Sequence, residues 1–338
     1  MKIYFMRNFK ISAVIFLSVT VFFLNETVGQ DIFTYHGDAV PANIETMYLK
    51  GLNWLVNKQN AQGYWEGQYG ADPGVVGLAV LAMLAHGEDP NFGPYAQAIK
   101  KGLNHILKQA NSQNGYIGSS MYNHGFATLA LAEAYGSVND PRLGPALKKA
   151  VDLILTSQAN NSRGAWRYSP ESTDADATVS GAQMVALFAA RNAGIGIPEK
   201  AIKKGLLFFR QSQSGDGGFG YTGPTGATPP CSAIGALVFT LAKQKNLSEH
   251  KSAIRYLKQL NFNNSGSHPY YYKYYAAQAF FHADSKEWKE WNDNNVKQLI
   301  NTQNPDGSWT SSRGSAFSTS AALLSLALNY RFLPIYER

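Results

Sequence analysis

A helical segment that recurs along the chain constrains its fold more than any other feature. The first copy spans residues 50–65 and opens with a Lys-Gly pair. The first residue of that pair returns, with drift in its neighbour, at Lys101, Lys149 and Lys204. The closing signature, a Gln followed by Gly and an aromatic residue, returns at Gln158, Gln213 and Gln303. A repeat of this length indicates stacked copies of one supersecondary unit, and we count six units.

Each unit predicts a pair of helices. The first helix is amphipathic, with apolar residues at helical spacing such as Leu52 and Leu55. A turn carrying Asn or Asp before Gly follows, and then a second helix that is apolar nearly all round, as in residues 77–82. Because such a helix must be buried, the second helices form an inner layer and the first helices an outer layer. We therefore predict an all-α fold, an (α/α)6 toroid of six helical hairpins.

The alternative architecture, an open solenoid, requires polar caps at both ends. The C-terminal residues 330–336 are instead mainly apolar, which favours a chain end that packs back onto the body.

The segment 50–65 reads Lys-Gly-x-x-Trp-Leu-x-x-x-Gln-x-x-x-Gly-x-Trp and resembles the QW repeat of squalene cyclases. Residues 44–338 as a whole resemble the prenyltransferase and squalene-oxidase repeat family, the toroids of terpenoid cyclases and protein prenyltransferases. In that family the Gln and Trp residues are structural. The resemblance therefore implies a scaffold role for these residues here: Gln59, Trp65, Gln158, Trp166, Gln303 and Trp309.

The N-terminal residues 1–29 read as a secretory signal peptide. Basic residues precede an apolar run from Ile11 to Leu24, and small residues follow near Gly29. An uncleaved membrane anchor is the alternative interpretation. In either case we expect a secreted, periplasmic or cell-envelope protein, with a short leader at 30–43 and a single toroid domain at 44–338.

Composition and motifs exclude several classes of function. Without the charged residues of segment 1–29 the formal net charge falls from +7 to +5 (7 − 3 + 1), and the recurring Lys pairs suit solvated outer helices rather than a nucleic-acid surface. Cys231 is the one cysteine, and the histidines lack metal-ligand spacing, so no metal site and no cofactor are expected. The Gly-rich residues 215–224 lack the Gly-Lys-Ser/Thr of a P-loop and read as a rim loop.

The start of each inner helix is the expected place for a ligand. Aligning the inner helices places one set of residues around a common mouth: Asp72, Tyr122, Asp176, Pro230 and Tyr271. Helix N-termini carry partial positive charge, which favours a carboxylate or an anionic ligand there. His124 lies beside Tyr122 and is the best histidine candidate, although a buried structural role is the alternative.

Residues 174–178, Asp-Ala-Asp-Ala-Thr, resemble the Asp-x-Asp-Asp-Thr-Ala motif of class II terpenoid cyclases. The resemblance implies that Asp176 is the acid that protonates the substrate and Asp174 its neighbour, with aromatic faces from Tyr271, Tyr274 and Tyr275 stabilising a cation. Ala177 departs from the motif, which has Asp there. The alternative is that Asp174 or Asp176 only caps the inner helix, since Asp is a preferred N-cap residue.

The sequence is compatible with three functions. The first is a secreted toroid whose central cavity binds, and in its stronger form transforms, an apolar isoprenoid or lipid, with association to the envelope or a membrane surface. The second is a glycan-active or glycan-binding toroid, which requires two acidic residues facing each other across a groove, such as Asp72 and Asp176. The third is a non-catalytic interaction scaffold with a filled centre.

Overall fold

The computed structural model describes residues 40–260 and 266–336. The predicted signal peptide and most of the predicted leader lie outside the described residues. The described part of the chain holds twelve α-helices and two short 3-10 helices, and no β-strand longer than a single bridge. The all-α prediction is confirmed.

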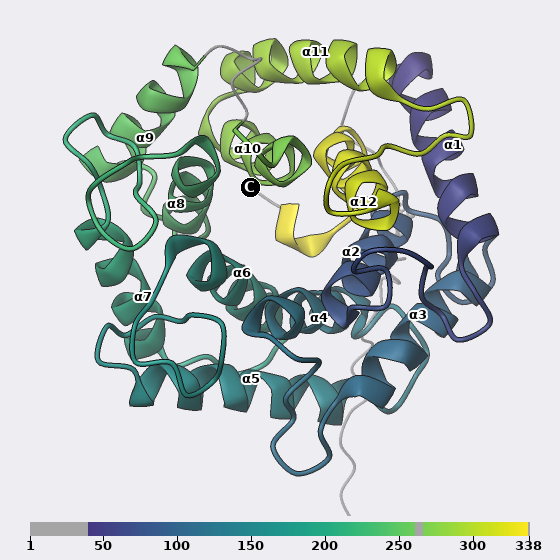
Figure 1. The fold of residues 1–338 in the computed structure, drawn as a ribbon, viewed down its shortest axis with the longest axis horizontal. Helices are drawn as coiled ribbons and strands as arrows, with labels where there is room; N and C mark the ends of the chain where they lie inside the picture. Colours follow the sequence, from purple (N-terminus) through teal and green to yellow (C-terminus); the bar gives the residue numbers. More distant parts are fainter. Residues whose placement is uncertain (1–39, 261–265, 337–338) are drawn as a thin grey trace, which may run out of the picture. The chain divides into compact units, whose positions relative to one another are not determined.

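The helices form two concentric layers (Figure 1). The outer layer consists of the odd-numbered helices α1 (Ala42–Lys58), α3 (Ala96–Gln109), α5 (Leu143–Asn160), α7 (Glu199–Gln211), α9 (Ser248–Gln259) and α11 (Ser285–Thr302). The inner layer consists of the even-numbered helices α2 (Pro73–Leu84), α4 (Met121–Ala134), α6 (Ala177–Asn192), α8 (Pro229–Leu241), α10 (Pro269–Ala283) and α12 (Ser315–Leu326). Six helical hairpins therefore close into a ring, as the repeat predicted.

The burial of each helix follows its sequence pattern. Every residue of α2 is buried, because its apolar and small side chains face neighbours on all sides. In α9, by contrast, the buried residues are His250, Ala253, Ile254 and Leu257, which recur at helical spacing on one face. The Lys pairs of the repeat lie on the solvent side of the outer helices, where Lys148 and Lys203 are exposed.

The repeated Gln residues join neighbouring units. The Gln59 side-chain amide donates to the Gly63 carbonyl at 3.2 Å and to the carbonyl of Ala98, in the next outer helix, at 3.0 Å. Gln158 and Gln213 donate in the same way to their own turn and to the following outer helix. Gln303 donates to the Met47 carbonyl at 2.9 Å and so connects the last unit to the first. This bond closes the ring.

The tryptophans at the end of the segment anchor each turn to its own outer helix. The indole N–H of Trp65 donates to the Leu55 carbonyl at 2.9 Å, and Trp166 and Trp309 donate to the equivalent carbonyls of Ile154 and Leu299. All three side chains are buried. The fourth turn has Phe219 instead, which packs against Phe209 and Phe239 and forms no such bond. The structural role expected for the Gln and Trp residues is therefore observed.

The C-terminal segment crosses one end of the ring. The 3-10 helices η1 (Ala327–Asn329) and η2 (Pro334–Tyr336) follow α12, and this segment ends inside the ring of inner helices (Figure 1). Ile335 and Tyr336 are buried. The Ile335 amide donates to the Glu133 carboxylate near the C-terminus of α4 at 3.5 Å. The end packs back onto the body as its apolar sequence predicted. It fills the centre at the C-terminal ends of the inner helices.

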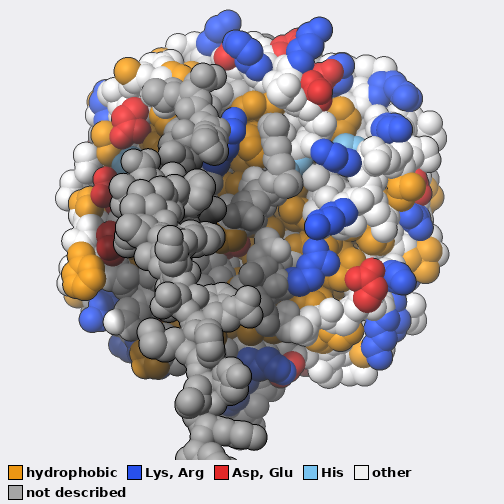
Figure 2. Space-filling model, turned by 180° about the vertical axis from the view of Figure 1, so that it is seen from behind, with side chains coloured by type: hydrophobic (Ala, Val, Ile, Leu, Met, Phe, Trp, Pro, Cys, Tyr) orange, Lys and Arg blue, Asp and Glu red, His pale blue; other side chains and the backbone are white. Residues whose placement is uncertain are grey.

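The reverse of the view in Figure 1 carries Lys and Arg side chains interspersed with hydrophobic and acidic ones (Figure 2). Among the helices that the structure describes, none is long and apolar enough to cross a membrane.

Candidate functional site

A cavity of about 690 Å³ lies where the inner helices begin. Its apolar surface comes mainly from Val75, Leu78, Phe126, Phe317 and two prolines, Pro229 and Pro230. Its aromatic walls carry five tyrosines: Tyr69, Tyr122, Tyr168, Tyr221 and Tyr271. Its size falls in the range of small-molecule sites, and its mixture of aromatic and apolar walls with a few polar groups is typical of them.

Four of the residues predicted for the mouth line this cavity: Asp72, Tyr122, Pro230 and Tyr271. Asp72 sits at the N-cap position of α2, but its side chain makes no capping hydrogen bond. Burial raises the pKa of the Asp72 carboxyl, and the neighbouring Asn123 side chain partly offsets that rise. Asp72 is also the one carboxylate among the described lining residues.

Asp176 lies behind the cavity wall and caps α6. Its Oδ1 accepts hydrogen bonds from the Thr178 and Val179 amides, both at 2.9 Å, and from the Thr178 hydroxyl at 2.6 Å. Its Oδ2 is buried without a hydrogen bond among the described residues, and the Arg167 Nε lies 3.8 Å away. Burial raises the pKa of Asp176 despite these hydrogen bonds. The capping alternative is therefore observed, whereas an acid role for Asp176 stays a prediction.

Thr178 connects Asp176 to the cavity. Its hydroxyl donates to Asp176, so the Tyr122 hydroxyl must be the donor in the short hydrogen bond between Tyr122 and Thr178. The Tyr271 hydroxyl donates to the Thr178 carbonyl at 3.4 Å. Both tyrosine hydroxyls thus retain a lone pair for a ligand that lies in the cavity.

Asp174, the second residue predicted from the cyclase-like motif, is not part of the cavity lining. Its carboxylate is exposed and forms an ion pair with Arg167. The Arg167 guanidinium also lies over the rings of Tyr168 and Tyr221, at 5.4 and 5.8 Å from their centroids. The structure therefore assigns Asp174 a place at the rim, where it orients Arg167.

His124 is a structural residue, and its predicted place at the mouth needs correction. Its Nδ1 accepts from the Ile117 amide at 3.1 Å, and its Nε2 lies 3.0 Å from the Ala150 carbonyl. A backbone donor on one nitrogen and a carbonyl on the other require the neutral ring with its proton on Nε2. Burial lowers the pKa of His124 to about 4. The ring has no capacity left for a ligand.

This histidine predicts a loss of stability in mild acid. The unfolded chain takes up the proton near the ordinary pKa of 6.5, whereas the folded chain does so near 4. The contribution of the buried neutral ring to the free energy of unfolding is therefore fully present above pH 6.5 and is lost as the pH falls toward 4. When the pH falls from 7 to 4.5, we expect the free energy of unfolding of His124→Gln to decrease by about 2 kcal/mol less than that of the wild type, as measured by urea unfolding. His250, whose pKa burial also lowers, is present in both proteins and contributes equally to both. An equal decrease in the free energy of unfolding of the two proteins would contradict the assignment of a neutral, buried His124.

Tyr274 and Tyr275 are buried in the core and do not belong to the cavity lining. Their rings contact each other with centroids 4.7 Å apart, and Tyr275 contacts Tyr271 at 5.1 Å. They lie one turn further along α10 than Tyr271, and so support Tyr271 from behind instead of facing a ligand.

Several lining residues were missed by the sequence argument. Tyr221 comes from the Gly-rich loop that reads as a bland rim segment, but its carbonyl accepts from the Ala177 amide at 2.7 Å and its ring lines the cavity. Tyr168 follows the repeat tryptophan of the third unit, and Arg313 precedes α12. No local pattern marks these residues, because each reaches the mouth only through the path of a long connection.

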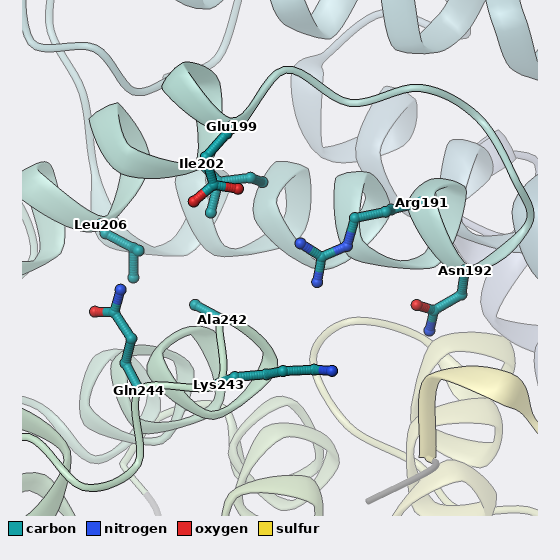
Figure 3. Close-up of a pocket in the computed structure, with 8 residues that line it drawn as sticks. All are labelled: Arg191, Asn192, Glu199, Ile202, Leu206, Ala242, Lys243 and Gln244. Carbon is teal, nitrogen blue, oxygen red and sulfur yellow. The ribbon is translucent and has the colours of Figure 1, made fainter.

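A second, smaller cavity of about 290 Å³ lies at the opposite ends of the inner helices, between α6, α7 and the segment after α8 (Figure 3). Arg191, Lys243 and Glu199 surround it together with polar amides. Neither cavity holds a metal-binding cluster: among the described residues no three His, Cys, Asp or Glu side chains gather.

The closed ring of helical hairpins with a cavity at the inner-helix N-termini defines an α/α toroid protein. Residues 45–268 match the sequence profile of a family described as a domain of unknown function, DUF6288, and the chain belongs to that family. A search of curated protein sequences finds no significant match.

Solved structures share this fold. An inactive variant of the α-1,6-mannanase GH76A of Salegentibacter sp. HEL1_6, in complex with α-1,6-mannotriose, matches with a TM-score of 0.64 and 10% identity over 84% of this chain and 98% of that chain. A variant of the type II terpene cyclase MstE from Scytonema, in complex with its product merosterolic acid A, matches with a TM-score of 0.59 and 17% identity over 86% of this chain and 98% of that chain. The predicted resemblance to terpenoid-cyclase toroids is thus confirmed for the fold, and function does not follow from the fold alone.

Proposed function

We propose that this protein binds an apolar small molecule, an isoprenoid or another lipid, in the cavity at the inner-helix N-termini. The observation that carries the proposal is the cavity itself, about 690 Å³ in volume and lined mainly by aromatic and aliphatic side chains. The C-terminal segment fills the ring behind it. An apolar cavity at the inner-helix N-termini, with the other end of the ring filled, suits a molecule that enters with its apolar part first.

The proposal also concerns where in the cell the protein acts. The basic and apolar N-terminal segment supports export to the envelope or beyond, where lipids are the available apolar molecules. Binding is the activity that the lining supports. The stronger form, acid-initiated transformation, would need Asp176 to act from behind Thr178, where burial raises the pKa of the Asp176 carboxyl and three hydrogen-bond donors only partly offset that rise.

The glycan alternative has less support. Glycoside hydrolysis generally uses two carboxyl groups on opposite sides of the scissile bond. Asp72 faces the cavity, but Asp176, the expected partner, is fully buried and occupied as a helix cap. The three repeat tryptophans, which would be the strongest stacking platforms for sugars, are buried in the scaffold.

Extraction of the bound molecule tests the proposal. We expect protein purified from its native source to release a near-stoichiometric apolar molecule into organic solvent, identified by mass spectrometry. Val75→Trp places an indole in the cavity and is expected to abolish retention of that molecule, because Val75 lines the apolar wall. Leu207→Trp, at an exposed position of α7, adds the same group outside the cavity and should retain it.

Circular dichroism and thermal melting verify that both variants fold. A wild-type extract without such a molecule, even after incubation with lipids from the source, would contradict the proposal. Equal retention by Val75→Trp would place the molecule elsewhere on the protein.

A further inference from the structure

Capping side chains and prolines reduce the number of free N–H groups that the helix ends at the mouth offer to an anion. Six inner-helix N-termini surround the cavity, and such ends usually bind anions through free N–H groups. Here Ser120, Asp176 and Thr228 cap α4, α6 and α8 with their own side chains. Proline opens α2, α8 and α10 and removes the N–H at the first helical position, although no side chain caps the following N–H groups of α2 and α10. Only α12 begins without a capping side chain or a proline.

The charges of the lining lead to the same conclusion. Arg313 is the one lysine or arginine among the described lining residues, and it stands next to α12. Its guanidinium lies 5.8 Å from the Tyr69 centroid and its Nη2 lies 3.2 Å from His268 Nε2. The Arg313 guanidinium already has partners, and its charge is balanced by the Asp72 carboxylate. A lining without net charge does not suit a phosphate or diphosphate.

Three lining residues have spare capacity to accept hydrogen bonds, whereas His268, whose Nε2 accepts from Arg313, keeps an Nδ1–H without a partner among the described residues. Asp72 forms neither a capping bond nor an ion pair among the described residues, although its helix end gives it the position to cap. The Tyr122 and Tyr271 hydroxyls donate hydrogen bonds to Thr178, and each oxygen keeps a lone pair that can accept one. The tyrosine faces around them also attract cations. The Asn123 side chain already hydrogen-bonds the Asp72 carboxyl, and a carboxylate has about four acceptor sites, so capacity remains for a donor on a ligand.

We propose that the ligand carries a hydrogen-bond-donating, non-anionic head, an alcohol or an ammonium group, and that Asp72 accepts from that head. This inference rests on the proposed function and adds the chemical class of the ligand to it. The apolar part of the molecule contacts Val75, Leu78 and Phe126, and the head remains at the mouth near α2.

Three probes with one apolar chain test the inference: farnesol, farnesylamine and farnesyl diphosphate, titrated calorimetrically into the full chain below their micellar concentrations. We expect the alcohol and the amine to bind at least about tenfold more tightly than the diphosphate. Asp72→Asn should weaken binding of the amine by roughly 10- to 100-fold, because a charged hydrogen bond is lost. Binding of the alcohol should change only a few-fold, since the Asn carbonyl still accepts.

Asp152→Asn, which removes the same charge from the exposed face of α5, is the matched control and should leave all three affinities unchanged. Tighter binding of the diphosphate would overturn the inference while leaving the proposed function intact. Unchanged amine affinity in Asp72→Asn would overturn the role of Asp72. Failure of all three probes, together with an empty native extract, would overturn the proposed function and this inference with it.

Discussion

Replacing Trp166 with alanine is expected to lower the free energy of unfolding by about 3–5 kcal/mol, the usual loss for a buried tryptophan. The side chain is buried between helices, and its indole N–H donates to the Ile154 carbonyl at 2.9 Å. Truncation leaves a large cavity and removes the indole hydrogen bond, while the Ile154 carbonyl keeps its hydrogen bond within α5. Urea unfolding followed by circular dichroism measures the loss.

The substitution should also damage the site. The Trp166 carbonyl accepts from the Asp176 amide at 3.1 Å, and Arg167 is the next residue. The matched control is Trp54→Ala, because Trp54 is only half-buried on α1 and should cost about 1–2 kcal/mol. Trp166→Phe, which keeps most of the volume, should fall between the two. A loss for Trp166→Ala no larger than that for Trp54→Ala would contradict a structural role for the repeat tryptophan.

Gly307→Ala is expected to cost about 3 kcal/mol because it strains the contact that closes the ring. Gly307 has a φ of 92°, and an added Cβ would lie 2.3 Å from the Lys50 carbonyl oxygen of the first unit. The new methyl group therefore meets two penalties, an unfavourable backbone conformation and a collision with backbone that cannot move without opening the ring.

Gly136→Ala separates these two penalties. Gly136 has the same φ of 92°, but nothing lies within 4 Å of its added Cβ. We expect it to cost about 1 kcal/mol, from the backbone conformation alone. The difference of about 2 kcal/mol measures the contact between the last and first units. Equal costs in thermal and urea unfolding would show that this contact does not contribute to stability.

The candidate site was predictable only in part. Aligning the repeats correctly placed four residues at the mouth, because each sits at an equivalent position before or within the first turn of an inner helix: Asp72, Tyr122, Pro230 and Tyr271. The same argument could not show that His124, two residues further along α4 than Tyr122, points away from the mouth and toward two backbone partners. A shift of two residues along a helix changes the direction of a side chain, and the alignment of weak repeats is not accurate to that level.

By itself the sequence determined the architecture. A repeated pairing of an amphipathic helix with an apolar one can bury its apolar faces only in two layers, and the recurring Gln, Gly and Trp residues specify how each unit meets the next. The tertiary structure alone decided the chemistry of the cavity. Tyr168, Tyr221 and Arg313 reach it through connections of different lengths, and no periodic pattern encodes where such a connection ends. Only the closed ring brings these residues, distant in sequence, around one mouth.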